Sequence, residues 1–341
     1  MTRINGWTSA AAGVLLLLAG CREVEVTTEI HRDGSLDRRV VVTSDEEDEM
    51  QTAYPLLGGE GWEKERRQVE SEGQTRWTET YRRSFRDARS LQEVMRLDPS
   101  EPYAIRPEVE LDERFRWFTT RYVWRESVPK VSPYDTIPLQ EWFSEAEIDS
   151  FFSDRASESL QERFETWQGR NFVEDLVLRV ADHAREEGLS AWDAEQLHAR
   201  SAALFDTVMA REEELDLDDL TPAILGALED TYGRDASQLE PAVRVWEEEL
   251  MAYLEGTSAL GEETYTFHVR MPGLLVDTTA REVEGNAATW DFDPDRLHYA
   301  DFEMRALSRV TNTWALWVTG AIILLVVVLA LISLIRRRSA Y

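Results

Sequence analysis

The feature that most constrains this chain is an uninterrupted apolar segment near its end. Residues Trp314 to Ile335 form a run of 22 positions without a charged side chain, and Arg336 to Arg338 follow directly. As a helix this run is about 33 Å long, which is enough to cross the hydrocarbon core of a bilayer. Only Thr319 and Ser333 carry hydroxyl groups, so the run lacks the polar face of a helix from a soluble domain. We therefore expect a transmembrane helix over residues 314–335.

The residues at the two borders of this helix indicate its orientation. Trp314 and Trp317 lie at the first border, where tryptophan rings favour the level of the lipid headgroups. The three arginines lie at the other border, and the positive-inside rule assigns them to the cytoplasm. Residues 336–341 are then a cytoplasmic tail, and everything before Trp314 is an ectodomain on the outer (periplasmic or extracellular) face of a bacterial cell membrane.

The first 20 residues have the composition of a secretory signal peptide, with Arg3 before an apolar core and small residues at the end. Leu18-Ala19-Gly20-Cys21 resembles the lipobox of bacterial prolipoproteins, in which a signal peptidase cuts before a lipid-modified cysteine. The resemblance implies lipidation of Cys21, which is the only cysteine in the chain. The alternatives are an ordinary signal peptide with an incidental cysteine, or an uncleaved anchor.

The charge of the ectodomain limits the partners that it can bind. Of the 37 basic residues, Arg3 and the three tail arginines lie outside residues 22–313, which leaves 33 basic against 66 acidic residues there. Phosphate backbones and anionic lipid surfaces bind clustered lysine and arginine, so this net charge of −33 disfavours both. We expect no nucleic-acid partner. A single cysteine also excludes a disulfide within the chain.

Alternation of apolar and polar residues predicts a β-rich region over residues 22–128. In the last hairpin predicted there, between residues 105–111 and 114–126, Asp112 and Glu113 form the turn. Strand-like alternation returns over residues 263–311, where too few strands remain to bury a core of their own. Three hairpins are expected in the first part, at residues 24–30 with 36–43, 63–70 with 74–85, and 105–111 with 114–126.

Residues 137–257, between these parts, show apolar residues at helical spacing and predict five helices. The fold class expected is therefore α+β, with a mainly antiparallel sheet domain, an inserted helical subdomain and one transmembrane helix. Two anchors, at Cys21 and Trp314, place Val24 and Val310 near the bilayer. We expect their strands to lie side by side, or nearly so, in one sheet.

The ectodomain carries no sequence motif of a known catalytic or metal site. Residues Asp291, Asp293 and Asp295 imitate the start of a calcium loop, but Arg296 and Phe302 occupy the positions of its glycine and glutamate. Carboxylates are so numerous that no acid–base pair is distinguished. We assign no catalytic, cofactor-binding or metal residue and expect no cofactor. The histidines are scattered, at His31, His183, His198, His268 and His298.

Residues 265–290 contain Met271-Pro272-Gly273, then Gly285-Asn286, then Trp290. This pattern resembles the LppM-like domains of bacterial envelope lipoproteins. The resemblance implies an envelope lipoprotein and no catalytic residue, and it does not extend to the helical block over residues 139–256.

Two classes of function follow from these observations. The favoured one is a non-catalytic envelope lipoprotein whose helical subdomain binds an envelope protein, with membrane lipid as its other partner. The alternative is an envelope enzyme that acts on cell-wall glycan or peptide through a carboxylate pair. An open cleft with two such acids and exposed tryptophans would favour the enzyme.

Overall fold

The strands form two sheets, and not the single sheet expected from the sequence. The computed structural model describes residues 22–47, 50, 52, 54, 61–71, 74–95, 105–151, 157–211, 219–258, 260 and 263–338. Within them, one sheet has seven strands in the order β3-β4-β2-β1-β7-β10-β9, and the other has four in the order β5-β6-β11-β8. Most neighbours are antiparallel, but β1 and β7 are parallel. The α+β class is confirmed. The prediction of a single sheet is wrong, because β11 pairs with β6 and β8 in the four-stranded sheet and not with β1.

The bounds of the strands follow the sequence expectation closely for the first two hairpins. The seven-stranded sheet contains β1 (Arg22–Ile30), β2 (Leu36–Ser44), β3 (Glu63–Ser71), β4 (Gln74–Phe85), β7 (Glu263–Arg270), β9 (Glu282–Glu284) and β10 (Ala287–Phe292). The four-stranded sheet contains β5 (Glu108–Arg116), β6 (Thr119–Val128), β8 (Leu274–Thr278) and β11 (Phe302–Thr311).

The third hairpin differs from its prediction in the position of its turn. Asp112 and Glu113, predicted to form the turn, lie within β5 opposite Val123 and Tyr122. The turn is at Trp117 and Phe118 instead. Turns that face water usually contain polar residues. The aromatic residues in this turn therefore indicate that the tip of the hairpin contacts an apolar partner and not only water.

The core of the β domain lies between the two sheets. One apolar cluster includes Val24 and Val26 from β1 together with Trp124 from β6 and Met304 from β11. The short helix α2 (Ala88–Val94) contributes Leu91 to the same cluster.

A buried ion pair also joins the two sheets. Arg38 on β2 donates to both carboxylate oxygens of Glu126 on β6, at 2.9 and 2.5 Å, and to Thr28 on β1 at 2.8 Å. Both charged side chains are almost fully excluded from solvent. Removal of one partner from such a pair leaves an uncompensated buried charge, so the contact between β2 and β6 is costly to break. Tyr54 also accepts from Arg38, and burial raises the pKa of its hydroxyl.

The inserted helical subdomain follows β6 and precedes β7, as predicted. Its helices are α3 (Leu139–Trp142), α4 (Glu145–Phe151), α5 (Glu158–Glu186), α6 (Ala194–Ala199), α7 (Ser201–Ala210), α8 (Thr221–Tyr232) and α9 (Glu240–Ser258), with a 3₁₀ turn η2 (Ser237–Leu239). Two of the five expected helices are split. Phe143 adopts an extended conformation after α3, and Arg200 leaves the helical conformation between α6 and α7. The largest helical core lies between α5, α7, α8 and α9.

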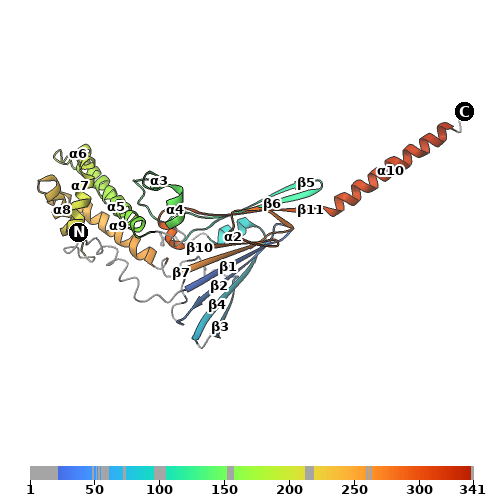
Figure 1. The fold of residues 1–341 in the computed structure, drawn as a ribbon, viewed down its shortest axis with the longest axis horizontal. Coiled ribbons are helices and arrows are strands. Elements are labelled where there is room, and N and C mark those ends of the chain that lie inside the picture. Colours follow the sequence, from blue (N-terminus) through green and yellow to red (C-terminus); the bar gives the residue numbers. More distant parts are fainter. Residues whose placement is uncertain are drawn as a thin grey trace.

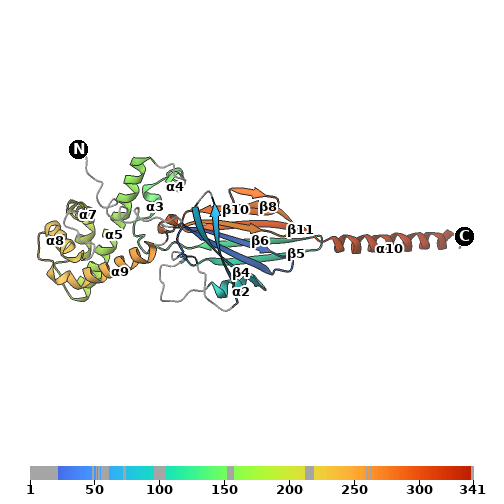
Figure 2. The same ribbon diagram turned by 90° about the horizontal axis from the view of Figure 1, so that it is seen from below.

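The helical subdomain and the apolar C-terminal helix lie at opposite ends of the β domain (Figures 1 and 2). Helix α10 (Thr313–Arg338) continues from β11 and projects away from the sheets. Residues 313–332 of α10 are long and apolar enough to span a membrane. Of these residues, Ala315 alone is buried.

Strand directions overturn the expectation that Val24 and Val310 lie at the same end. β1 begins beside the start of β7, with Arg22 opposite Glu263, which is the end next to the helical subdomain. Gly273, after the far end of β7, lies against the Arg309 backbone and the Val310 side chain. From Glu263 to Gly273 the chain advances roughly 30 Å at strand rise. Val24 and Val310 are therefore at opposite ends of the β domain.

Candidate functional site

Asn312 forms the joint between the β domain and α10. Its backbone N–H donates to Phe118 O at 2.9 Å, and its side-chain amide donates to Arg116 O at 2.9 Å. Thr120 donates to its side-chain oxygen at 3.2 Å. Its carbonyl oxygen accepts from the N–H of Ala315, in the first turn of α10, at 3.0 Å. Asn312 therefore connects the tip of the β5–β6 hairpin, through its side chain and its backbone N–H, to the start of the apolar helix, through its backbone carbonyl.

Aromatic side chains surround this joint and face outward. Trp117 donates from its indole N–H to the Thr319 hydroxyl at 2.8 Å, and its ring packs edge-on against Trp314, with centroids 5.3 Å apart. The ring of Phe115 stacks parallel to the ring of Trp314, with centroids 6.3 Å apart. Phe118 is 46% exposed and Trp317 80% exposed. Rings at this density on a surface are typical of a membrane interface, where one edge is apolar and the other wet.

Arginines occupy the outer face of the four-stranded sheet just above this aromatic tip. Arg114 on β5 lies directly opposite Arg121 on β6, and Arg121 lies directly opposite Arg309 on β11. Arg116 is at the tip end of β5. All four side chains are exposed. Like charges in directly opposite positions destabilise a sheet, so this row calls for an anionic counterpart.

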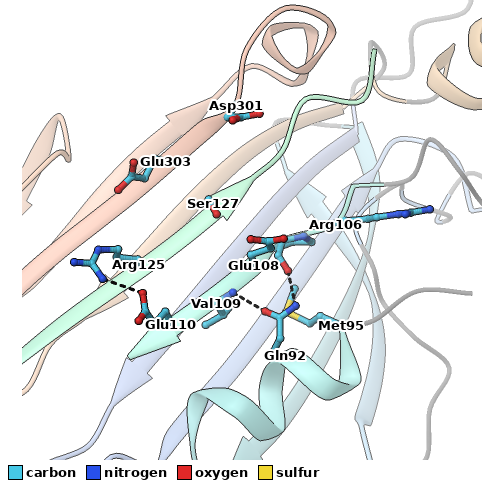
Figure 3. A pocket seen from close by; sticks show the side chains of 11 residues that line it. Gln92, Met95, Arg106, Glu108, Val109, Glu110, Arg125, Ser127, Asp301 and Glu303 are labelled. Carbon is cyan, nitrogen blue, oxygen red and sulfur yellow. Dashed lines mark hydrogen bonds and ion pairs between the residues drawn. The ribbon is translucent and has the colours of Figure 1, made fainter. Parts of the chain in front are cut away.

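An open hollow of about 1020 Å³ lies at the other end of the same sheet (Figure 3). Acidic residues from β5 and β11, including Glu108 and Glu303, face it together with Gln92 of α2. Two of its polar side chains have structural partners: Glu110 pairs with Arg125 at 2.9 Å, and Gln92 accepts from the Val109 N–H at 2.6 Å. Its described lining residues include no tryptophan. The exposed tryptophans lie at the opposite end of the sheet, and so the expected signature of a glycan cleft is not assembled here.

The junction with the helical subdomain contains one of the five scattered histidines in a buried contact. His298, at the end of η4 (Pro294–His298), shares a hydrogen bond through Nδ1 with the hydroxyl of Tyr253 on α9. Burial lowers the pKa of His298 to about 4, against a smaller opposing effect of the Asp293 carboxylate. Tyr299, the next residue, packs against Phe151, Phe164 and Trp167 of the helices. This histidine therefore belongs to the interface between the two parts.

The other residues singled out in the sequence lie in separate places. Cys21, the predicted lipidation site, is outside the described residues. His31 pairs with Asp37, His183 with the Gln238 carbonyl oxygen, and His268 with Thr289, while His198 lies near Glu174. No group of three histidine, cysteine, aspartate or glutamate side chains in the described ranges is arranged to hold a metal ion.

The residues of the Met-Pro-Gly pattern support the fold around the strands that follow β7. Asn286 exchanges hydrogen bonds with the backbone of Met271, accepting from its N–H at 2.9 Å through the main chain and donating to its carbonyl oxygen at 2.5 Å. Trp290 donates from its indole N–H to Thr279 at 3.1 Å. The pattern is therefore accounted for by turn geometry and packing.

The residues that sequence analysis missed are Asn312 and the arginine row. In the sequence, Asn312 is one of two residues between the predicted strands, which end at residue 311, and the apolar run from Trp314. The arginines are dispersed along the sequence and meet only through the register of β5, β6 and β11. A correct position for the third turn would have aligned Arg114 with Arg121.

Comparison with known proteins yields one structural match. No family model and no curated protein sequence matches the chain. The NMR structure of the folded domain of LppM from Mycobacterium tuberculosis is similar at 10% sequence identity, over 87% of this chain and 95% of that one, with a TM-score of 0.28. At this identity and TM-score the match is too distant to transfer any residue's role to this chain.

Proposed function

We propose that this protein is a cell-envelope lipoprotein, held by lipid at Cys21 and by the span α10, whose ectodomain is a non-catalytic scaffold with a partner-binding helical subdomain. The observation that carries the proposal is the direct continuation of β11 through Asn312 into α10, with the aromatic hairpin tip packed on the same helix. These contacts tie the tip of the β domain to the start of the proposed span, so this end of the ectodomain stays next to the membrane.

The helical subdomain is proposed as the part that binds an envelope protein. It lies at the end of the molecule away from α10 (Figure 1), and Val245 on α9 is 50% exposed. Single exposed apolar side chains are normal on protein surfaces, so the location of the subdomain supports this part of the proposal, and Val245 serves as the position at which it is tested.

The lipid anchor adds a geometric requirement to the proposal. Cys21 is covalently linked to Arg22, so their Cα atoms are about 3.8 Å apart. Arg22 lies at the helical end of β1. Both anchors can therefore enter one bilayer only if α10 turns relative to β11 at Asn312.

Mass spectrometry of the mature N-terminus tests the lipid anchor. We expect an acylated Cys21 and the absence of residues 1–20, and we expect Cys21→Ser to block processing. Normal cleavage of that variant would show that the lipobox interpretation is wrong.

A tag placed after Tyr341 tests the topology. The tag should be protected from protease added to intact cells. Cleavage of the tag by that protease would show that the proposed orientation is wrong.

Photo-crosslinking in intact cells tests the partner surface. A photoreactive residue at Val245 on α9 should capture an envelope protein, whereas the same residue at Val283 on β9, which is 53% exposed, should not. Equal capture at both positions would contradict a partner-binding role of the helical subdomain.

An activity assay tests the alternative function. Hydrolysis of cell-wall glycan or peptide by the purified chain, abolished in Glu303→Gln, would favour an envelope enzyme over a scaffold.

A further inference from the structure

We propose that the arginine row, defined as Arg114, Arg116, Arg121 and Arg309, is a binding site for the phosphate groups of lipids in the leaflet next to the ectodomain. The proposal rests on the membrane insertion of α10 proposed above. The inference goes beyond that insertion, because a single span can hold a domain at a bilayer without any contact between the domain and the lipid headgroups.

The register of the strands places three of these guanidinium groups on one face. Residues directly opposite in an antiparallel ladder point to the same side of the sheet. Arg114, Arg121 and Arg309 are consecutive opposite positions across β5, β6 and β11. The other face of these strands carries the core residues Tyr122, Trp124 and Val310, so the arginine row faces away from the core.

The ion pairs on this face leave an excess of positive charge at its tip end. Further along the same face, Arg125 pairs with Glu110 at 2.9 Å and Arg305 with Asp277 at 2.8 Å. Arg114 has Asp112 at 2.7 Å. Within the described part of the chain, Arg116, Arg121 and Arg309 form no ion pair with a carboxylate. The ectodomain has twice as many acidic as basic residues. Three neighbouring arginines without a carboxylate partner among the described residues therefore stand out from the rest of its surface.

The position of the row fits a headgroup layer. The contact between Trp117 and Thr319 brings the hairpin tip level with the second turn of α10. A hydrocarbon core of about 30 Å corresponds to about 20 helical residues, and counted back from Arg336 it begins near Leu316. Arg309 precedes Thr313 by four residues, or about 13 Å of strand. An extended arginine side chain therefore reaches within a Debye length, about 8 Å, of the phosphates.

The charge gradient along the same face supports this occupant. Its far end carries Glu108, Glu303 and Asp301, which an anionic surface would repel. Basic residues lie at the end near α10 and acidic residues at the end away from it. Guanidinium groups form paired hydrogen bonds with phosphate oxygens, and the aromatic tip supplies the adjoining apolar contact.

Lipid selectivity of the full-length chain tests this site. The chain is reconstituted in liposomes of phosphatidylcholine with a minor fraction of dansyl-labelled lipid, either phosphatidylglycerol or phosphatidylcholine. Energy transfer from tryptophan to the dansyl group reports the relative association of the two lipids. We expect selectivity for phosphatidylglycerol in the wild type and a drop of about 5-fold per arginine in the double variant Arg121→Gln/Arg309→Gln.

A matched double variant controls for net charge. Arg185→Gln/Arg244→Gln removes two exposed arginines of the helical subdomain and should leave the selectivity of the wild type unchanged. Unchanged selectivity in the first double variant, or an equal drop in both, would overturn the proposal. Competition by inorganic phosphate that abolishes the selectivity at low millimolar concentration would assign the site to a soluble anion instead.

Thermal unfolding provides a second measurement with opposite expected signs. In zwitterionic detergent the Arg121→Gln/Arg309→Gln variant should unfold at the same or a higher temperature, because repulsion between opposite arginines is removed. In liposomes with phosphatidylglycerol it should unfold at a lower temperature than the wild type, because a bound ligand is lost. A lower midpoint in both would indicate a structural role only. Extraction of the full-length chain by alkaline carbonate would instead contradict the proposed span itself.

Discussion

At the scale of single residues, Gly273, in the turn between β7 and β8, packs directly against β11. Its φ is +79°, and a Cβ atom built there would lie 2.6 Å from Arg309 O and 2.8 Å from the Val310 side chain. Both are parts of β11, so they have little freedom to move. We expect Gly273→Ala to lower the free energy of unfolding by roughly 3 kcal/mol or more, from backbone strain and the clash together. Urea denaturation of the full-length chain in detergent measures this.

Gly285 supplies the matched control for this prediction. It has a similar φ of +64°, but nothing lies within 4 Å of the position of a Cβ atom. Gly285→Ala should therefore cost only the strain of the left-handed conformation, about 1 kcal/mol. An equal cost for the two variants would mean that the contact with β11 is absent in solution.

The sequence contained both glycines in a recognisable pattern, yet their different roles could not be predicted from it. Positive φ can be expected for a glycine in a tight turn, as in the Pro272-Gly273 pair. Close approach to Arg309 depends on a strand that comes more than 30 residues later and belongs to the other sheet. The same limit applies to the arginine row, since the charges are visible in sequence and their register is not.

At the scale of elements, the junction of η4 with α9 contains a buried titratable side chain, His298. His298 has its pKa lowered from 6.5 to about 4 by burial, so the unfolded chain binds more protons than the folded chain between these values. Stability from this group is complete above about pH 7, falls as the pH drops through 6.5, and reaches its minimum below 4. The expected loss is roughly 3 kcal/mol.

Comparison with His298→Gln isolates this effect from the many carboxylates that titrate nearby. We expect the difference in unfolding free energy between wild type and variant to change with pH between 4 and 7 and to be constant above 7. His183→Gln, at a histidine bonded to a carbonyl oxygen on the helical surface, should follow the wild-type curve. Parallel curves for wild type and His298→Gln would contradict a buried, neutral His298.

Element prediction succeeded where the alternation of apolar residues was regular and failed at the third hairpin. Val24, Val26 and Ile30 place one face of β1 on the core, and the first hairpin follows. In the third hairpin, Asp112-Glu113 has the composition of a turn in water, and Trp117-Phe118 does not. The prediction of a turn at Asp112-Glu113 depends on a hairpin tip that faces water. In the structure the tip of this hairpin packs on the first turns of α10.

At the scale of the whole molecule, the α+β class, the inserted helices and the apolar helix could be predicted because each depends on local periodicity and length. The two sheets and the direction of β1 could not, since both depend on which strands pair over long distances. Membrane anchoring at both ends of residues 22–313 suggested that the first and last strands lie together. The pairing of β1 with β7 places them apart.

Lipidation should therefore change the height of the helical subdomain above the bilayer. A dye on Ser237→Cys, at an exposed position before α9, can be compared in two forms of the membrane-inserted protein. One is the lipidated protein, and the other is produced from Arg22 onward without the signal segment and reconstituted in the same liposomes. Energy transfer to a lipid probe should be stronger in the lipidated form, by a height difference on the order of 30 Å. Equal transfer would show that Cys21 exerts no pull toward the bilayer.

The separation of the two ends of the β domain has a consequence for encounter with other envelope proteins. A body attached to a surface at one point can tilt and spin, whereas a body attached at two points about 30 Å apart can only rock about the line that joins them. The helices beside Arg22 would then sweep a thin layer next to the bilayer. For a partner confined to the same layer, this raises the effective concentration and makes even a weak contact sufficient.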